Sequence, residues 1–270
     1  MRRLAVAGLL LTLTACAPGG CQQSGTPETG DANPLEEPLP GDPDAPAEPE
    51  APPAPEPVSW PHEPGGSLHP GSGNGATDAT LWAAGMRFPM EAGPAYANSQ
   101  VYGYGGYLAP GPGGQCDARN YSYPWRDNFC ETRSWTNGMC PAGKGHQGQD
   151  IRPATCEKKV HWAVAAESGK ITSIGSYTVT LLGDSGRIYR YLHLDMAGVH
   201  ALFPNVASRT VTRGQHIGKV SNDFGGNATT IHLHFEIKAP VSNGGGATVM
   251  FVPTYSSLVD SYGRLLNGAA

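Results

Sequence analysis

Residues 230–237 read Thr-Ile-His-Leu-His-Phe-Glu-Ile, and this alternation of polar and apolar side chains predicts a half-buried β-strand. Successive side chains of a strand point to opposite faces, so His232 and His234 share one face and the apolar residues share the other. Two imidazoles on an apolar support can bind a metal or act as an acid–base pair. A His-x-His pair in an exposed strand is also a common accident, so the rest of the chain decides between these interpretations.

The remaining apolar runs of the chain are short and interrupted by glycine, which is typical of strands. Strands are expected at residues 160–166, 169–174, 177–182, 187–194, 211–220 and 232–238. The Gly-Asp-Ser-Gly sequence at residues 183–186 predicts a hairpin turn, and residues 256–266 are the one helical candidate. This pattern predicts an all-β domain built on a small antiparallel sheet.

Two further segments bring polar groups to the ends of predicted strands. The loop at residues 143–150 contains His146 and Asp150, and its three glycines argue against a helix. We therefore expect His146 on a turn that leads Asp150 into a strand. In residues 187–194, the alternation places His193 on the face of the two preceding tyrosines, opposite the leucines. Four histidines and one carboxylate thus end strands or line turns.

In order and spacing, five segments resemble the catalytic domain of the lysostaphin-like (LytM-like) zinc metallopeptidases, which cleave peptidoglycan peptides. The resemblance rests on residues 145–151 (GHQGQDI), 165–171 (AAESGKI), 191–194 (YLHL), 213–218 (RGQHIG) and 232–236 (HLHFE). It covers about a third of the chain. It implies a LytM-like β-sheet domain of the duplicated-hybrid-motif type at residues 141–270.

The resemblance also implies roles for five residues. His146, Asp150 and His234 would hold one zinc ion per chain, and His193 and His232 would be unliganded catalytic histidines. Three nitrogen and oxygen ligands leave a fourth zinc position open, as catalytic sites require. One histidine would take a proton from water and the other would donate to the developing oxyanion, in an order that stays open. Zinc ligation by Cys140 or Cys156 is the alternative.

The N-terminus predicts export. Residues 1–15 combine Arg2 and Arg3 with an apolar run, and the run ends in Leu-Thr-Ala before Cys16. This resembles a bacterial lipoprotein signal, in which the cysteine becomes lipidated; the alternative is an ordinary secretory signal with an incidental cysteine. We expect anchoring at a bacterial membrane on the periplasmic side, and Ala17 after the cysteine favours the outer membrane.

Charge divides the chain into two parts. Residues 22–86 contain eleven acidic and no basic residues, whereas residues 87–270 contain sixteen Lys plus Arg and twelve Asp plus Glu. Residues 16–80, which are rich in Pro, Ala, Glu and Asp, are therefore expected to form a disordered acidic tether. The mildly basic remainder suits an anionic polymer such as the cell wall, and no nucleic-acid motif is present.

Residues 81–140 form an approach segment rich in Tyr, Gly and Trp. Its aromatic residues could line a substrate groove or pack within a disulfide-linked insertion. The cysteines at positions 116, 130, 140 and 156 allow three pairings in an oxidising compartment. Pairing of sequence neighbours would join Cys116 to Cys130 and Cys140 to Cys156.

The combined expectation is a zinc endopeptidase that hydrolyses peptide cross-links of peptidoglycan, with D-alanyl–diaminopimelate as the expected bond. Two alternatives remain from the sequence. One is a non-catalytic LytM-like module that activates a wall amidase; such modules typically lack zinc ligands. The other is a peptidase that acts on Gly-rich proteins of competitors or prey.

Overall fold

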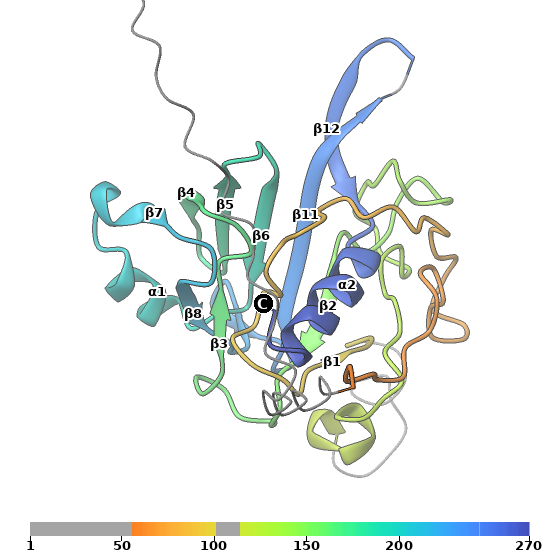
Figure 1. Cartoon of the computed structure of the whole chain (residues 1–270), viewed down its shortest axis with the longest axis horizontal. Helices are drawn as coiled ribbons and strands as arrows, with labels where there is room; N and C mark the ends of the chain where they lie inside the picture. Colours follow the sequence, from red (N-terminus) through yellow and green to blue (C-terminus); the bar gives the residue numbers. More distant parts are fainter. Residues whose placement is uncertain (1–55, 101–113, 243, 270) are drawn as a thin grey trace, which may run out of the picture. The chain divides into compact units, whose positions relative to one another are not determined.

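The computed structural model describes residues 56–100, 114–242 and 244–269 (Figure 1). The predicted signal peptide, Cys16 and most of the predicted tether lie outside the described residues. All described residues fall within one compact unit, Ala54–Ala270. The segment boundaries expected at residues 80 and 140 both lie within this unit.

An antiparallel sheet dominates the described part, which confirms the predicted fold class. In spatial order it contains β1 (Tyr96–Ala97), β2 (Gln149–Arg152), β11 (Leu233–Ser242), β6 (Ile188–Leu192), β5 (Thr178–Gly183), β4 (Gly169–Ile174) and β7 (Thr210–Val211), with β12 (Ala247–Val252) paired to β11. Two small antiparallel pairs accompany it: β3 (Trp162–Val164) with β8 (His216–Lys219), and β9 (Asp223–Phe224) with β10 (Asn227–Ala228).

Helices are few in the described residues. They are α1 (Met196–Leu202), α2 (Tyr255–Leu266) and three short 3₁₀ turns at Gly114–Cys116, Ala118–Asn120 and Val206–Arg209. No helix among the described residues is both long and apolar enough to cross a bilayer. Helix α2 confirms the predicted helix, whereas α1 and β12 were not predicted. The single strand expected at residues 211–220 is two strands, because a turn at Gly214 (φ 84°) separates β7 from β8.

The apolar face of β11 lies in the hydrophobic core, as its alternation predicts. Leu233, Phe235 and Ile237 are fully buried. Phe235 and Ile237 lie opposite Tyr191 and Tyr189 of β6, whose side chains are also buried. Truncating a buried Phe to Ala typically costs about 3–5 kcal/mol, so this face supplies much of the stability that holds the opposite, polar face in place.

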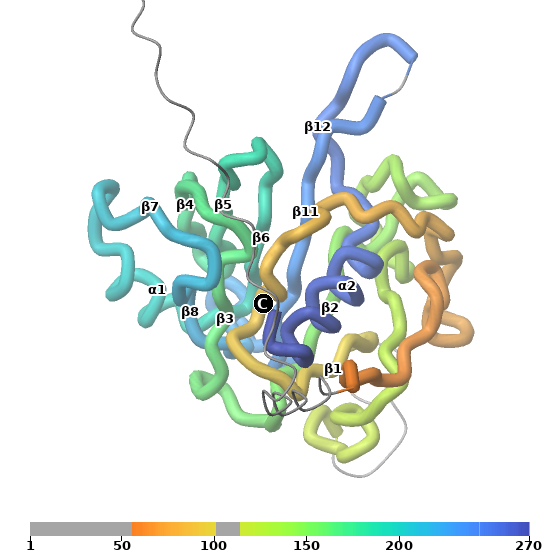
Figure 2. Tube along the Cα trace, viewed as in Figure 1, coloured from red at the N-terminus to blue at the C-terminus, as the bar shows by residue number. Residues whose placement is uncertain are grey.

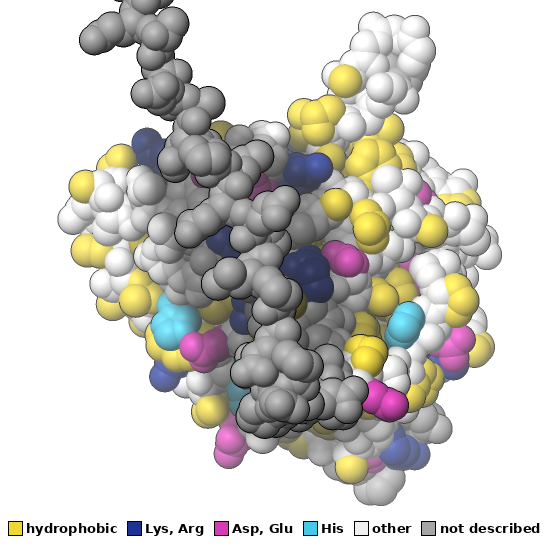
Figure 3. Space-filling view, viewed as in Figure 1, with side chains coloured by type: hydrophobic (Ala, Val, Ile, Leu, Met, Phe, Trp, Pro, Cys, Tyr) yellow, Lys and Arg dark blue, Asp and Glu magenta, His cyan; other side chains and the backbone are white. Residues whose placement is uncertain are grey.

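The end of β11 and the whole of β12 form a ribbon that projects beyond the rest of the sheet (Figures 1 and 2). Residues 239–252 contain no charged side chain, and the ribbon tip is accordingly white and yellow in Figure 3. Only the first half of β11 pairs with β2 and β6. That half carries His234, so the candidate site lies in the body of the domain.

The predicted tether ends earlier than residue 80. Trp60 packs edge-on against Tyr262 of α2, with ring centroids 4.9 Å apart. The backbone N–H of Gly66 donates to Asp127 at 2.8 Å, and Thr132 donates to the carbonyl of Ser72 at 2.7 Å. Composition over this window predicts disorder, but one partly buried aromatic ring and a few hydrogen bonds are enough to attach it to the domain.

The predicted disulfide pairing is wrong. The bridges are Cys116–Cys156 and Cys130–Cys140. The end of β2 brings the segment before Cys156 against the first 3₁₀ turn, where Arg152 donates to the carbonyl of Gln115 at 2.9 Å. The expected pairing fails because the fold brings Cys156 back to Cys116, which leaves the two intervening cysteines to pair with each other.

Candidate metal centre

The register of three strands places polar groups on one face of the sheet. His234 of β11 lies directly opposite Asp150 of β2 and Leu192 of β6. Directly opposite residues point to the same face, with Cβ atoms about 4.5–5.5 Å apart. The Nδ1 atom of His234 accordingly lies 3.0 Å from Oδ1 of Asp150.

His146 reaches the same point from the loop before β2. Its backbone N–H donates to the Glu131 carbonyl at 2.9 Å, and its carbonyl accepts from Cys130 at 3.0 Å. A Cβ at Gly145 (φ 159°) would lie 2.8 Å from the Cα of Cys130, so only glycine permits this close approach. The Nε2 atom of His146 is 2.9 Å from Nδ1 of His234 and 3.4 Å from Oδ1 of Asp150.

The structure thus brings together the three residues predicted as metal ligands. His146, Asp150 and His234 each offer one ligand atom, and these atoms lie within 4.8 Å of one another. All three side chains are buried. The two predicted catalytic residues are adjacent: Nε2 of His232 is 3.4 Å from Oδ1 of Asp150, and the His193 and His232 rings are 4.7 Å apart.

His193 reaches the site by a route that alternation does not predict. Strand β6 ends at Leu192, and the tyrosines that were expected to share a face with His193 lie in the core. His193 adopts φ 67°, a left-handed conformation that is uncommon for a residue with a Cβ. This turn moves its side chain from the core side of the strand to the side of His234. The predicted shared face is therefore wrong, although the predicted site residue is present.

His146 and His234 each make a hydrogen bond on the side of the ring that faces away from the centre. This bond determines which ring nitrogen faces the candidate metal site. Nδ1 of His146 donates to the Asn128 carbonyl at 3.0 Å, and Nε2 of His234 donates to Glu236 at 2.9 Å. Glu236 in turn pairs with Arg190 at 2.5 Å. The opposite nitrogens, Nε2 of His146 and Nδ1 of His234, therefore face the centre and offer lone pairs to a metal when they carry no proton. Such outer partners orient metal-binding histidines.

The other two histidines follow the same rule. Nδ1 of His193 donates to the Asp223 carbonyl at 2.9 Å, and Nδ1 of His232 donates to the Thr230 carbonyl at 2.8 Å. In the neutral rings Nε2 is then unprotonated and can accept a proton. Burial, followed by the neighbouring histidines, lowers the pKa of His193 to about 2. Burial also lowers the pKa of His232.

The charges of the candidate ligand residues complement one another. Burial acts to raise the pKa of Asp150, but His146 and His232 outweigh it and hold that pKa well below its usual range. Burial acts to lower the pKa of His234, whereas hydrogen bonds to Asp150 and Glu236 raise it to about 9. A metal that binds His234 must displace this proton, so metal binding would release protons.

Asn128 is a site residue that the sequence did not reveal. Its Nδ2 donates to Oδ2 of Asp150 at 2.8 Å, and its Oδ1 accepts the backbone N–H of Asp150 at 3.1 Å. Its carbonyl orients His146, as described above. Asn128 lies in the approach segment, outside every segment of the family resemblance, and no local motif distinguishes it.

The approach segment contributes less of the site than its aromatic content suggests. Trp125 is fully buried, and Tyr96, Tyr121 and Tyr123 pack on one another. Tyr102, Tyr104 and Tyr107 lie outside the described residues. Trp135, at 45% exposure, lines the cavity over the ligand residues. Because Cys140 and Cys156 are disulfide-bonded, the alternative of zinc ligation by cysteine is wrong.

Two adjoining cavities form one cleft over the candidate ligand residues. The smaller, of about 100 Å³, is lined by all five predicted site residues and by Gln100, Arg133, Trp135, Phe224 and Thr229. The larger, of about 420 Å³, shares Trp135, His193, Phe224 and His234 with it and adds Thr136, Gln147, Tyr177, Arg190, Leu192 and Glu236. The two cavities therefore meet beside His193 and His234.

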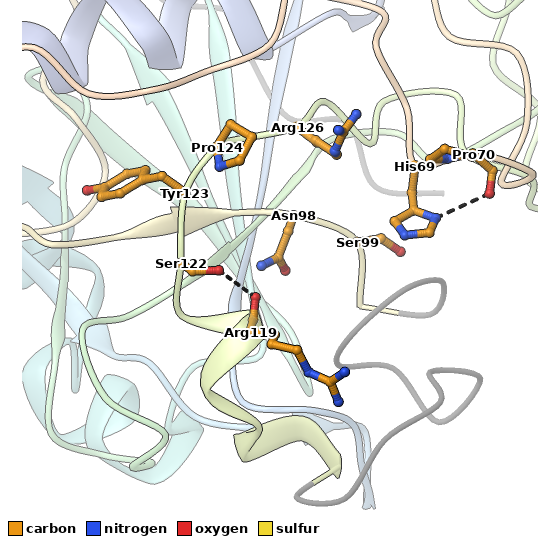
Figure 4. Close-up of a pocket in the computed structure, with 9 residues that line it drawn as sticks. All are labelled: His69, Pro70, Asn98, Ser99, Arg119, Ser122, Tyr123, Pro124 and Arg126. Atoms are coloured by element: carbon orange, nitrogen blue, oxygen red, sulfur yellow. Dashed lines mark hydrogen bonds between the residues drawn. The ribbon is translucent and has the colours of Figure 1, made fainter.

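A separate cavity of about 450 Å³ contains none of the predicted site residues (Figure 4). Arg119, Ser122 and Tyr123 line one side, and His69 and Arg126 lie across from them. Arg119 pairs with Asp117 at 2.7 Å, and Arg126 pairs with Glu63 at 3.5 Å.

Residues 144–247 match the model of peptidase family M23. Comparison with curated proteins found no match. The catalytic domain of lysostaphin from Staphylococcus simulans is 20% identical, with 46% of this chain and 85% of that chain covered at a TM-score of 0.32. A zinc containing peptidase from Vibrio cholerae is 28% identical, with 43% of this chain and 35% of that chain covered at a TM-score of 0.27. A LytM protein from Ruminococcus gnavus is 21% identical, with 43% of this chain and 46% of that chain covered at a TM-score of 0.34. The chain thus spans less than half the length of two of these three proteins.

Proposed function

We propose that the protein, whose residues 144–247 match the model of peptidase family M23, is a zinc-dependent endopeptidase that hydrolyses peptide cross-links of peptidoglycan. The observation that carries the proposal is the convergence of two imidazole nitrogens and one carboxylate oxygen beside two further histidines. Wall-amidase activators of this type typically lack zinc ligands, whereas this chain retains all three candidates.

The spacing of the candidate ligand atoms fits zinc. Ligand atoms about 2.0–2.1 Å from a tetrahedral zinc ion lie roughly 3.3 Å from one another. The three pairwise distances here are 2.9, 3.0 and 3.4 Å. Imidazole and carboxylate donors with an open fourth position are typical of catalytic zinc. His146, Asp150 and His234 would hold the ion, which would serve as a Lewis acid and lower the pKa of water from about 15.7 towards 7.

His193 and His232 would handle the protons. Both present an unprotonated Nε2, and the downward direction of both pKa values keeps the rings neutral near pH 7. A neutral ring with its Nδ1 proton committed to a carbonyl can accept a proton at Nε2 but cannot donate from it. Whichever ring accepts the proton therefore becomes the donor, through Nε2–H, to the developing oxyanion or the leaving amine.

We propose the D-alanyl–diaminopimelate bond as the scissile bond. A lipoprotein on an acidic tether suits an envelope with direct cross-links, and the mild excess of basic residues in 87–270 favours anionic muropeptides. The test is a digest of purified sacculi with the zinc-loaded protein, followed by chromatography of the muropeptides. Loss of cross-linked dimers with a matching gain of monomers is the expected result.

Two other outcomes would overturn this assignment. Cleavage of pentaglycine with unchanged dimers would show that the enzyme cleaves glycine bridges instead. Release of intact stem peptides only after addition of a wall amidase would indicate an activator instead. The variant His232→Ala is the control, because loss of a proton-handling residue should remove most of the dimer cleavage while zinc remains bound.

We propose that Cys16 is lipidated and anchors the protein to the periplasmic side of a membrane, with the outer membrane favoured. Roughly forty residues separate Cys16 from the described part of the chain. In polyproline II conformation, at about 3.1 Å per residue, they would span roughly 100 Å, enough to carry the domain towards the wall. Cys16→Ser should move the protein to the soluble fraction; retention in the membrane would contradict the lipid anchor.

A further inference from the structure

The loop closed by Cys130–Cys140 forms one wall of the cleft. It carries Arg133 and Trp135, both of which line the cavity over the ligand residues. The loop is attached to the segment that carries His146 by the hydrogen bond from His146 to Glu131 and by a bridge between Thr136 and Lys144. Arg133 is therefore held in a defined position relative to the ligand residues, although it lies outside the family match.

The guanidinium of Arg133 is held from behind. Its Nη2 pairs with Glu131 at 2.8 Å, and its Nη1 donates to the Thr132 carbonyl at 2.8 Å. The Glu131 side chain is fully buried, and the Arg133 side chain is 16% exposed. A guanidinium has five N–H donors, and within the described residues these two bonds are the ones that Arg133 makes. Three donors remain for a ligand in the cleft.

The other arginine of the cleft has a different role. Arg190 lines the larger cavity, and its Nη1 is bound to Glu236, which orients His234. Glu131, which holds Arg133, bonds His146 through its backbone carbonyl rather than through its carboxylate. Arg133 is thus the cleft cation that a substrate can engage without disturbing the metal-binding groups.

A positioned guanidinium preferentially binds a carboxylate. In a D-alanyl–diaminopimelate cross-link, the carbon bonded to the scissile nitrogen also bears a free carboxylate, whereas a glycine bridge has none beside its scissile bonds. We propose that Arg133 forms a subsite for this carboxylate and so selects stem-peptide cross-links over uncharged peptides. The inference rests on the proposed function, because it assigns the specificity of the same cleft.

The test compares Arg133→Gln and Arg133→Lys with wild type on two substrates: a cross-linked muropeptide dimer, and the same dimer with that carboxylate amidated. Wild type should cleave the acid form with a kcat/KM about 10- to 100-fold higher, as expected for a charge-assisted hydrogen-bonded pair. Arg133→Gln should lower the kcat/KM for the acid form to that for the amidated form and leave the kcat/KM for the amidated form unchanged. Arg133→Lys should retain part of the preference.

Arg119→Gln is the matched control. Arg119 also pairs with a carboxylate two residues earlier, Asp117, but lines the separate cavity of Figure 4. It should leave the preference for the acid form unchanged. Zinc content and circular dichroism of each variant show whether it has folded.

Two results would overturn the subsite. If Arg133→Gln loses activity equally on the acid and amidated substrates, Arg133 stabilises the oxyanion or the fold and does not bind the carboxylate. If wild type cleaves both substrates equally well, carboxylate recognition is excluded. Calorimetric titration of the full chain with acid and amidated stem peptides decides the same point without turnover. If wild type cleaves neither dimer, the proposed function fails, while the ratio of the two affinities, lost or retained in Arg133→Gln, still decides the subsite.

Discussion

Asn128→Ala should weaken zinc binding although Asn128 is not a candidate ligand. The side chain is 1% exposed and makes two hydrogen bonds to Asp150, one to its carboxylate at 2.8 Å and one to its backbone N–H at 3.1 Å. Alanine would remove both and leave a buried N–H without an acceptor. The hydrogen bond from His146 to the carbonyl of residue 128 would remain, so the variant isolates the side chain.

The magnitude follows from these contacts. A hydrogen bond to a charged group contributes about 1.5–3 kcal/mol, and an unpaired buried polar group costs about 1–3 kcal/mol. Part of this loss appears as reduced stability, about 2–4 kcal/mol in the metal-free protein. Loss of the hydrogen bond to the Asp150 carboxylate also leaves that carboxylate free to rotate. This should raise the Kd for zinc by about 10- to 100-fold, the range typical when a metal ligand loses a hydrogen-bond partner.

Zinc competition against chelators of graded affinity measures the Kd, and urea denaturation of the stripped protein measures the stability. Asn137→Ala is the control: Asn137 is 3% exposed in the same approach segment, and its Oδ1 accepts from Met139 rather than from a ligand residue. It should leave the Kd for zinc unchanged. A Kd in Asn128→Ala within twofold of wild type, or an equal loss in Asn137→Ala, would refute the reasoning.

Three further predictions concern the ligands, a disulfide and a buried carboxyl. His234→Ala should lose both zinc and activity, whereas His232→Ala should keep zinc and lose most activity; full zinc occupancy in His234→Ala, measured by metal analysis, would exclude it as a ligand. Replacing both cysteines of Cys116–Cys156, which are 40 residues apart, should lower the free energy of unfolding in urea by about 4 kcal/mol in the chain-entropy model. Non-reducing peptide maps should show this bridge, and finding its cysteines in another pairing would contradict the structure. Burial raises the pKa of Asp127 to about 6, so its folded form takes up a proton before the unfolded form does. Relative to Asp127→Asn, wild type should therefore gain up to about 3 kcal/mol as the pH falls from 7 to 4, and a pH-independent difference in urea denaturation would contradict this.

Periodicity within single segments predicted much of the fold. The alternation in residues 230–237 identified the face of β11 that enters the core, and the same rule located β4, β5 and β6 to within a few residues. It failed for His193, because a residue just past the end of a strand no longer follows the two-residue repeat. It also failed for residues 211–220, where a turn at Gly214 divides the expected strand in two.

The spacing of His146 and Asp150, and the pair His232 and His234, identified the candidate site from the sequence, because the family resemblance supplies an order that alternation alone does not. Which cysteines pair, that Asn128 binds Asp150, and that Arg133 lines the cleft were decided only by the tertiary structure. These contacts join segments with no shared periodicity: Asn128 meets Asp150 across 22 residues, and Cys116 meets Cys156 across 40. A local pattern reports which face a side chain takes, whereas the neighbour on that face depends on how strands pair and loops close, and that is a property of the folded chain.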